Sequence, residues 1–343
     1  MVKIFLVLFF SRVLILIIPI IVWQLSGKTD LSWVQWDAPH FIYIAQHGYT
    51  NIGDEANFIV FPPAFPLAIK FLNPIFVSIL SFSYAGIFFY KIVRQIWKKD
   101  IAKKALFLLA IFPTSYFFTA PYTESLFWLV SMLSIWFCLQ KRWTMAGIFA
   151  GLAFLTRFPG LLLLPVLLIY ISQTKQKVLN SLLVILPFAF CIIIYLYINW
   201  QVYNDPLAFQ KILHDHWQKT FSFPWQSILS SWRVASGGLD EYSLQVGWWE
   251  AIPATVGVVL IPFVFKYLKN TAWSAWFLLS IFLITSTSFL LSTPRYLLAV
   301  PPLFVFLAII SQKYKWFYYV WIFISAGLLT YFSMRFVTGQ WSF

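Results

Sequence analysis

The chain has 343 residues, of which 61% are hydrophobic and only 10% are charged. Apolar segments of about 20 residues, each able to cross a hydrocarbon core of about 30 Å, recur along it and exclude a large soluble domain. The net charge of +13 does not indicate nucleic-acid binding, because the basic residues are scattered over short loops instead of forming one stripe.

The pattern predicts an all-α, polytopic membrane protein with about eleven spans, forming one membrane-embedded domain over residues 1–343. The first apolar run is kept as a span, because Trp23, Gln24 and Leu25 follow where a signal peptide would need small residues. The predicted spans are 4–23, 74–96, 105–120, 124–140, 144–157, 160–172, 178–199, 248–265, 271–291, 294–311 and 316–334.

Basic residues occupy alternate connections between these spans. The positive-inside rule makes those connections cytoplasmic, with the N-terminus inside and the C-terminus outside. All 4 histidines, and all of the 11 acidic residues except Asp100, then fall on the outer side, where we expect the chemistry to occur. The basic residues in question are Lys98, Lys99, Lys103, Lys104, Lys141, Arg142, Lys175, Lys177, Lys266, Lys269, Lys313 and Lys315.

Two outer segments, 24–73 and 200–247, are long enough to hold a site. In the first, Asp37 is well placed to cap a short helix, with Pro39 in its first turn and Gly48 at its end. Helical spacing puts the polar and apolar residues on different sides, which predicts a helix lying in the membrane interface. The first side holds Asp37, His40, Ile44 and His47, and the apolar surface holds Phe41, Ile42 and Ala45.

The stretch from Asn57 to Leu67 contains three prolines and cannot form one regular helix, so we expect a bent aromatic segment that walls a cavity or simply re-enters the membrane. In the second outer segment, His214, Asp215 and His216 are adjacent and make a poor metal cluster. That segment also has a discontinuous apolar pattern, which predicts partly interfacial helices that cover a donor or present an acceptor. The pattern consists of Phe209, Ile212, Leu213, Trp217, Phe221 and Trp225.

The block WDAPHFIYIAQHGY (Trp36 to Tyr49), followed by NFIVFPPAFPL, resembles the PIG-V family of mannosyltransferases in the GT-C glycosyltransferase superfamily. Four later blocks are also similar, so the resemblance covers most of the chain. They are FPTSYFFTAPYTESLFWL (Phe112 to Leu129), GLAFLTRFPGL (Gly151 to Leu161), VGWW (Val246 to Trp249) and STPRYLLAVPPLF (Ser292 to Phe304).

The resemblance implies an inverting transferase that moves a hexose, with mannose expected, from a polyprenyl- or dolichyl-phosphate sugar to an acceptor hydroxyl on the extracytoplasmic side. The membrane would be the cell membrane in a prokaryote and the endoplasmic reticulum in a eukaryote. Besides membrane lipids, the expected partners are this donor and a glycolipid, glycan or protein acceptor that no motif identifies. No Asp-x-Asp motif accompanies Asp37, so the sequence supports neither a metal nor another cofactor.

Asp37 occupies the position of the family's WD motif, and a single displacement needs one such base because a phosphate leaves without an obligatory acid. Two interpretations of Asp37 stay open, the catalytic base and a simple helix cap. Asp54 and Glu55 are rival acids, better explained as solvated loop residues.

Arg157 and Arg295 lie at outer span ends, where each binds the donor phosphate, anchors its span or pairs with Glu124. Glu124 itself begins a span, where it stabilises the helix N-terminus or contacts an acceptor or metal. His40 binds a sugar hydroxyl, orients Asp37 or is an ordinary interfacial histidine. Three aromatic residues stack on sugar rings or belong to the membrane belt, namely Trp36, Tyr49 and Tyr122.

The alternative function is a lipid or glycolipid transporter, or a non-catalytic scaffold of the same fold. A flippase is expected to carry functional charges within its spans and to open to both leaflets. Here all the acidic residues except Asp100 lie on the outer side, which favours an enzyme that acts at one face.

Overall fold

A computed structural model describes all 343 residues, which form helices joined by turns and contain no strand. This confirms the all-α prediction. The chain divides into two compact units, each assembled from three separate stretches of sequence. The prediction of a single membrane-embedded domain stays a prediction.

Unit 1 comprises Met1–Val13, Val34–Ile92 and Phe118–Gln218. Two of its helices, α1 and α5, continue for a few residues into unit 2. Its helices are α1 (Val2–Ile15), α3 (Ala38–His47), the 3₁₀ helix η1 (Asp54–Val60), α4 (Ala64–Ile69), α5 (Pro74–Ile96), α7 (Glu124–Leu139), α8 (Trp143–Thr156), the 3₁₀ helix η3 (Phe158–Leu162), α9 (Leu163–Ser172), α10 (Lys177–Tyr203) and α11 (Ala208–Asp215).

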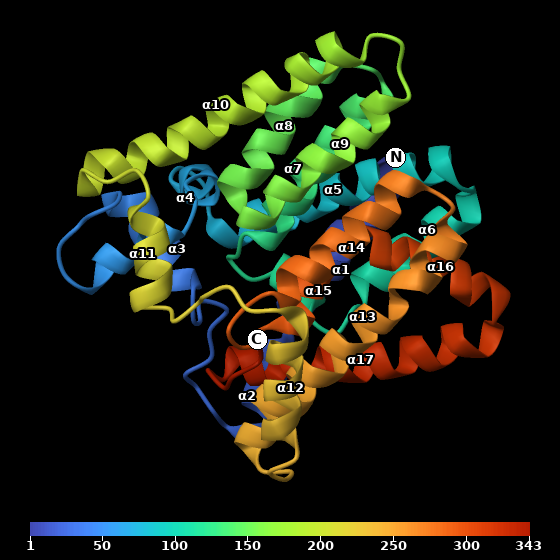
Figure 1. Cartoon of the computed structure of the whole chain (residues 1–343). Helices are drawn as coiled ribbons and strands as arrows, with labels where there is room; N and C mark the ends of the chain where they lie inside the picture. Colours follow the sequence, from blue (N-terminus) through green and yellow to red (C-terminus); the bar gives the residue numbers. More distant parts are fainter. The chain divides into compact units, whose positions relative to one another are not determined.

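Within unit 1, α8 packs against both α7 and α10 (Figure 1). Gly147 and Gly151 of α8 face α10 so closely that a Cβ at Gly151 would lie 2.5 Å from Cys191 Sγ. Glycines four residues apart are typical of membrane helices whose backbones approach closely. This contact fixes the end of α8, where Arg157 follows.

Unit 2 comprises Leu14–Trp33, Val93–Phe117 and Lys219–Phe343. Within it, α16 packs against α6 and α17, and α12 packs against η4 and α13. Its helices are α2 (Ile18–Ser26), α6 (Lys99–Ala110), the 3₁₀ helix η2 (Ser115–Phe118, whose last residue belongs to unit 1), α12 (Pro224–Ala235), the π-helix η4 (Ser243–Trp248), α13 (Trp249–Leu268), α14 (Thr271–Thr285), α15 (Thr293–Leu298), α16 (Pro301–Lys313) and α17 (Lys315–Val337).

Several helices are long and apolar enough to cross a membrane, which supports a multi-pass membrane protein. Only 22% of the apolar 18-residue stretch of α10 is buried, so most of the apolar surface of this helix is available to lipid. Five further apolar helices have 10–17 residues, and the count of about eleven spans stays a prediction. The 5 long candidates are Val2–Ser26, Pro74–Ile96, Lys177–Tyr203, Ser243–Leu268 and Lys315–Val337.

The predicted span 4–23 forms two helices, α1 and α2, and two further predicted spans are interrupted before a proline. The helix in segment 105–120 ends at Ala110, and Pro113 follows in the turn that leads to η2. The segment 294–311 consists of α15 and α16, which separate at Ala299 and Val300 just before Pro301. Both breaks have the same cause, because proline disfavours helical backbone in the residue before it and lacks an N–H to donate.

Candidate active site

The helix predicted after Asp37 forms as α3 (Ala38–His47). Pro39 lies in its first turn, where a missing N–H costs nothing, and the N–H of Gly48 donates to Ile44 O at 2.9 Å. Gly48 has a φ of +81°, a conformation that glycine adopts without strain. Local sequence therefore places Asp37 at the beginning of a short, well-terminated helix.

The carboxylate of Asp37 makes no capping hydrogen bond with α3. A cap normally accepts from the second or third backbone N–H of the helix, but the second residue here is Pro39. The third, His40, donates its N–H to the backbone oxygen of Asp37 at 3.1 Å. The structure therefore does not support the interpretation of Asp37 as a simple helix cap.

Tyr122 holds the turn that carries Asp37. Its side chain is fully buried, its hydroxyl donates to Gln35 O at 2.7 Å, and it accepts from the backbone N–H of Asp37 at 3.1 Å. Between these two residues, Trp36 has a φ of +54°, which is uncommon for a residue with a side chain. Tyr122, 85 residues away in sequence, therefore positions Asp37. Because Tyr122 is buried, it has no open face on which a sugar ring can stack.

His40 lies among aromatic rings next to Asp37. Its ring centroid is 4.3 Å from that of Phe58 and 5.4 Å from that of Phe61. Burial lowers the pKa of His40, the charge of Asp37 raises it and the charge of His216 lowers it, with a net decrease. The Nδ1 atom is buried and makes no hydrogen bond, so the neutral imidazole can exchange a hydrogen bond with a ligand.

The second outer segment contributes two residues here that the sequence did not single out as site residues. Trp217 lies 6.3 Å from the ring of His40 and 5.7 Å from that of Phe61, and its buried Nε1 makes no hydrogen bond. His216 is close enough to His40 to affect its charge. The sequence signal for these two residues was the apolar pattern of residues 200–247, which predicted a segment that covers the site. Their neighbour His214 does not join them and pairs with Asp215 at 2.6 Å on the surface.

The apolar side of α3 is covered by protein, which corrects the prediction that it faces the membrane interface. Phe41 packs edge-on against Phe61, Phe65 and Tyr122, with centroids 5.1, 5.4 and 6.0 Å apart. Ile44, which helical spacing placed near Asp37, His40 and His47, is buried. The error arose because Phe61 and Phe65 come from the proline-rich segment, whose fold the sequence did not define.

That segment forms η1, an extended turn at Phe61 and the short helix α4. Tyr49 ties it to the end of α3, because its hydroxyl donates to Phe61 O at 2.6 Å. Burial, with a contribution from Tyr195, raises the pKa of Tyr49. Of the three aromatic candidates for sugar stacking, Trp36 is the one whose side chain is substantially exposed, at 40%.

Glu124 and Arg157 form a buried ion pair in unit 1. Glu124 is the first residue of α7, and Arg157 follows the last residue of α8, with its Nη1 also 3.4 Å from Thr123 Oγ1. The ion pair joins the end of α8 to the beginning of α7. The two opposite charges offset each other. Among the alternatives predicted for Arg157, the structure contains the pairing with Glu124.

Arg295 lies in unit 2, on α15, with its guanidinium carbon 4.7 Å from the centroid of Phe117. The neighbouring backbone N–H groups of Ser292 and Thr293 donate to the buried carboxylate of Glu250 at 2.7 and 2.8 Å. Lys219 donates to Phe289 O at 3.1 Å, and burial lowers its pKa to about 8. The role of Arg295 in phosphate binding stays a prediction.

No three His, Cys, Asp or Glu side chains gather in an arrangement that would hold a metal ion. The candidate site in unit 1 combines the carboxylate of Asp37, the imidazole of His40 with His216 nearby, and the indole N–H of Trp217, surrounded by aromatic rings. Such a set can accept a proton and bind hydroxyl groups in a place with little water.

Residues 70–200 match the family of dolichyl-phosphate-mannose-protein mannosyltransferases. This match includes Glu124 and Arg157 and leaves Asp37 outside, and it supports a membrane-bound glycosyltransferase. The chain is also similar to the oligosaccharyltransferase of Archaeoglobus fulgidus, a structure in complex with zinc and sulfate, with 12% identity and a TM-score of 0.48. The alignment covers 97% of this chain and 53% of the other, so the chain spans about half the length of that enzyme. No curated protein matches the chain by sequence.

Proposed function

We propose that the chain is an inverting glycosyltransferase that moves a hexose, mannose in the first instance, from a polyprenyl- or dolichyl-phosphate sugar to an acceptor hydroxyl at the extracytoplasmic face of the membrane. The observation that carries the proposal is the environment of Asp37, whose carboxylate makes no capping bond to α3 and lies beside His40. The family match of residues 70–200 supports the lipid-phosphate donor. The resemblance of the Trp36 to Tyr49 block to the PIG-V family supports mannose as the sugar.

In the proposed reaction Asp37 takes the proton of the acceptor hydroxyl while the hydroxyl oxygen of the acceptor attacks the anomeric carbon. The bond between that carbon and the phosphate oxygen breaks, and the lipid phosphate leaves with the electron pair. One displacement inverts the anomeric centre and needs no second carboxylate, in contrast to most glycosidases. Asp37 then loses its proton to water.

His40 and Trp217 hold the sugar or the acceptor through hydroxyl groups. A hydroxyl can donate to one buried nitrogen and accept from the other, which would satisfy both His40 Nδ1 and Trp217 Nε1. The lowered pKa of His40 keeps its imidazole neutral at neutral pH, so it does not become a charged donor that pairs with the Asp37 carboxylate and weakens it as a base. Glu124 and Arg157 support the site as a neutral pair.

The test is transfer of radiolabelled mannose from polyprenyl-phosphate-mannose by membranes that contain the wild type or Asp37→Asn, with a crude lipid extract as acceptor. We expect the substitution to lower transfer by about 10²- to 10⁴-fold, the usual contribution of a general base. The thermal unfolding temperature should stay close to that of the wild type, because no capping bond is lost.

Asp54→Asn is the matched control, since Asp54 is an exposed acid in the same outer segment. It should transfer mannose as the wild type does. Equal transfer by Asp37→Asn and wild type would show that the base lies elsewhere, and absence of transfer by all three proteins would favour the transporter.

A further inference from the structure

A cavity of about 290 Å³ lies within unit 2, where α13 begins and α17 ends. Its aromatic lining includes Trp249 at the start of α13, Tyr331 on α17, and Trp341. Glu241, Gln245 and Arg335 supply polar groups. Since both helices are candidate membrane spans, the cavity lies at span ends, where a water-soluble group can reach it.

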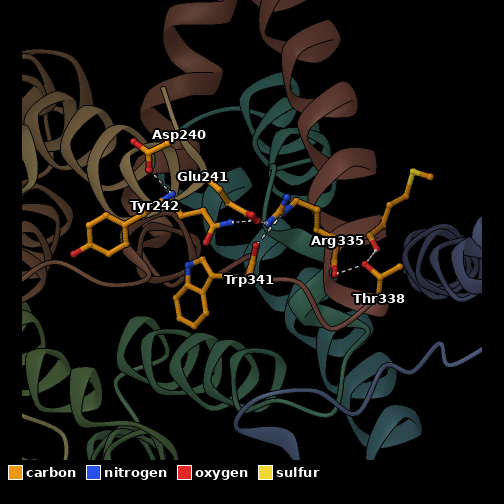
Figure 2. A network of polar contacts seen from close by, with 8 residues as sticks. Asp240, Glu241, Tyr242, Arg335, Thr338 and Trp341 are labelled. Carbon is orange, nitrogen blue, oxygen red and sulfur yellow. Dashed lines mark hydrogen bonds and ion pairs between the residues drawn. The ribbon is translucent and has the colours of Figure 1, made fainter. Parts of the chain in front are cut away.

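The polar groups of this cavity are connected to one another (Figure 2). Arg335 donates from Nη2 to Glu241 Oε1 at 2.7 Å and from Nε to Trp341 O at 3.1 Å. Gln245 donates from Nε2 to Glu241 Oε1 at 2.8 Å. The hydrogen bond and the charge of Arg335 lower the pKa of Glu241, so its carboxylate is ionised at neutral pH and offsets the charge of the arginine.

This charge balance decides which ligands fit. The charged side chains of the lining are one carboxylate and one guanidinium, and they neutralise each other. A phosphate would have to compete with Glu241 for Arg335, and a cation would have to compete with Arg335 for Glu241. A neutral ligand rich in hydroxyl groups can instead use the remaining hydrogen-bonding capacity of these side chains without breaking the ion pair.

The backbone around the cavity is packed closely enough to hold this arrangement in place. Gln245 lies on the π-helix Ser243–Trp248, a rare widened turn that occurs often at functional sites. A Cβ at Gly247 in the same helix would lie 2.5 Å from the backbone nitrogen of Ala235, so the π-helix packs directly against α12. The side chains of Gln245 and Trp249 therefore project from a fixed segment.

We propose that this cavity is a saccharide-binding site for a neutral hexose residue of the acceptor glycan. Its volume of about 290 Å³ is just below the roughly 300–1,000 Å³ of small-molecule sites, which suits a single sugar residue. The rings of Trp249, Tyr331 and Trp341 provide apolar faces, and the polar network provides donors and acceptors at the edge. Naming an acceptor glycan as the source of the sugar rests on the proposed function, whereas the sugar-binding chemistry rests on the cavity alone.

The test is saturation-transfer NMR on the full chain in nanodiscs without glycolipid or sugar-based detergent, with the methyl glycosides of mannose, glucose and galactose as probes. We expect at least one glycoside to receive saturation from the wild type. Gln245→Leu should reduce that transfer at least about fivefold, because the amide both contacts the ligand and orients Glu241.

Gln201→Leu is the matched control. Gln201 also donates from Nε2 at 2.8 Å to a residue four positions earlier on an exposed helix surface, but it lies in unit 1. It should leave glycoside binding unchanged. Equal loss in both variants, unchanged binding in Gln245→Leu, or no binding of any glycoside to the wild type would each overturn the proposal, as would displacement of the glycoside by millimolar inorganic phosphate.

The mannose-transfer assay separates this proposal from the proposed function. Asp37→Asn should bind the glycoside as the wild type does, since Asp37 does not line the cavity. A wild type that binds glycosides through Gln245 but transfers no mannose retains the saccharide site and loses the proposed reaction. A wild type that transfers mannose but binds no glycoside retains the reaction and loses the saccharide site.

Discussion

At the scale of single residues, Asp37 shows how one proline changes the role of a helix-capping position. Pro39 removes the second donor of α3, and the third donor, the N–H of His40, binds the backbone oxygen of Asp37. A carboxylate that would otherwise stabilise a helix end is thereby left to other partners. Tyr122 then fixes the backbone of Asp37 from outside the helix.

Tyr122→Phe tests this positioning role. The substitution leaves Gln35 O without the donated hydrogen bond and Asp37 N without its acceptor, so we expect a loss of about 1–3 kcal/mol in the free energy of unfolding. We also expect kcat for mannose transfer to fall more than KM changes, because a displaced base acts mainly on the transition state. Steady-state kinetics and thermal unfolding measure the two effects.

Tyr195→Phe is the control for Tyr122→Phe. Tyr195 is equally buried and its hydroxyl donates to Ile59 O at 2.7 Å, without contacting Asp37. Both variants should lose stability, and only Tyr122→Phe should lose turnover beyond its loss of folded protein. If the two lose turnover in proportion to stability, Tyr122 has no positioning role.

His216→Ala tests the electrostatics of His40. Burial lowers the pKa of His40 most, Asp37 raises it, and His216 lowers it further. Removing the imidazole of His216 should therefore raise the pKa of His40 towards its ordinary value of 6.5. A ¹³C-labelled histidine titration by NMR measures this shift, and His47→Ala, an exposed change on the same helix, should leave it unaltered. An unchanged or lowered pKa in His216→Ala would contradict the arrangement.

The lowered pKa of His40 also makes the stability of the folded chain depend on pH. The folded chain binds a proton at His40 less readily than the unfolded chain does, so the unfolded state carries more protons as pH falls below 6.5. The contribution of His40 to stability is then present above its unfolded pKa and is lost as pH decreases through its folded pKa. His216→Ala should narrow the pH range between the folded and the unfolded pKa of His40, over which this contribution to stability is lost.

At the scale of helices, the contact between α8 and α10 depends on two glycines. A Cβ at Gly147 would overlap the backbone of Val184 and lie 2.8 Å from Pro187 Cγ, neither of which can move easily. We therefore expect Gly147→Ala to cost about 1–3 kcal/mol in the free energy of unfolding, as overpacking does. Chemical denaturation in detergent measures this cost.

Gly327→Ala is the matched control, because Gly327 also lies inside a long apolar helix and has nothing within 4 Å of an added Cβ. Alanine is the better helix former by about 1 kcal/mol, so this variant should be neutral or slightly more stable. A similar response of the two variants would mean that the close approach of α8 and α10 does not limit stability.

How far the helices could be predicted depended on what defines each end. For α3, local residues are sufficient, since Pro39 and Gly48 mark its first turn and its end. The break at Ala299 and Val300 was also encoded locally by Pro301, but continuous hydropathy concealed it. The burial of Phe41 was not predictable, because it depends on Phe61 and Phe65, whose path follows from tertiary packing.

At the scale of the whole molecule, composition predicted the all-helical class because long apolar segments leave few alternatives in a membrane. The candidate site was predicted only in part. Asp37 and His40 are in one motif, whereas Tyr122 is 85 residues away from Asp37 and Trp217 lies in the other long outer segment. Contacts over such separations are fixed by packing, and nothing in the local pattern at Tyr122 marks it as a partner of Asp37.

The charge pattern makes a prediction for the entire chain, namely that the segment around Asp37 and the loop before α10 lie on opposite sides of the membrane. Asn51 and Lys175 are exposed in unit 1, one in each segment, and the native Cys138 and Cys191 are buried. In sealed, right-side-out vesicles, a membrane-impermeant maleimide should label Asn51→Cys at once and Lys175→Cys only after permeabilisation, with no labelling of the wild type. The physical reason is that basic loops are retained in the cytoplasm during insertion. Labelling of both variants before permeabilisation would place the two segments on the same side, and Asp37 could then not be assigned to the extracytoplasmic face on the basis of charge.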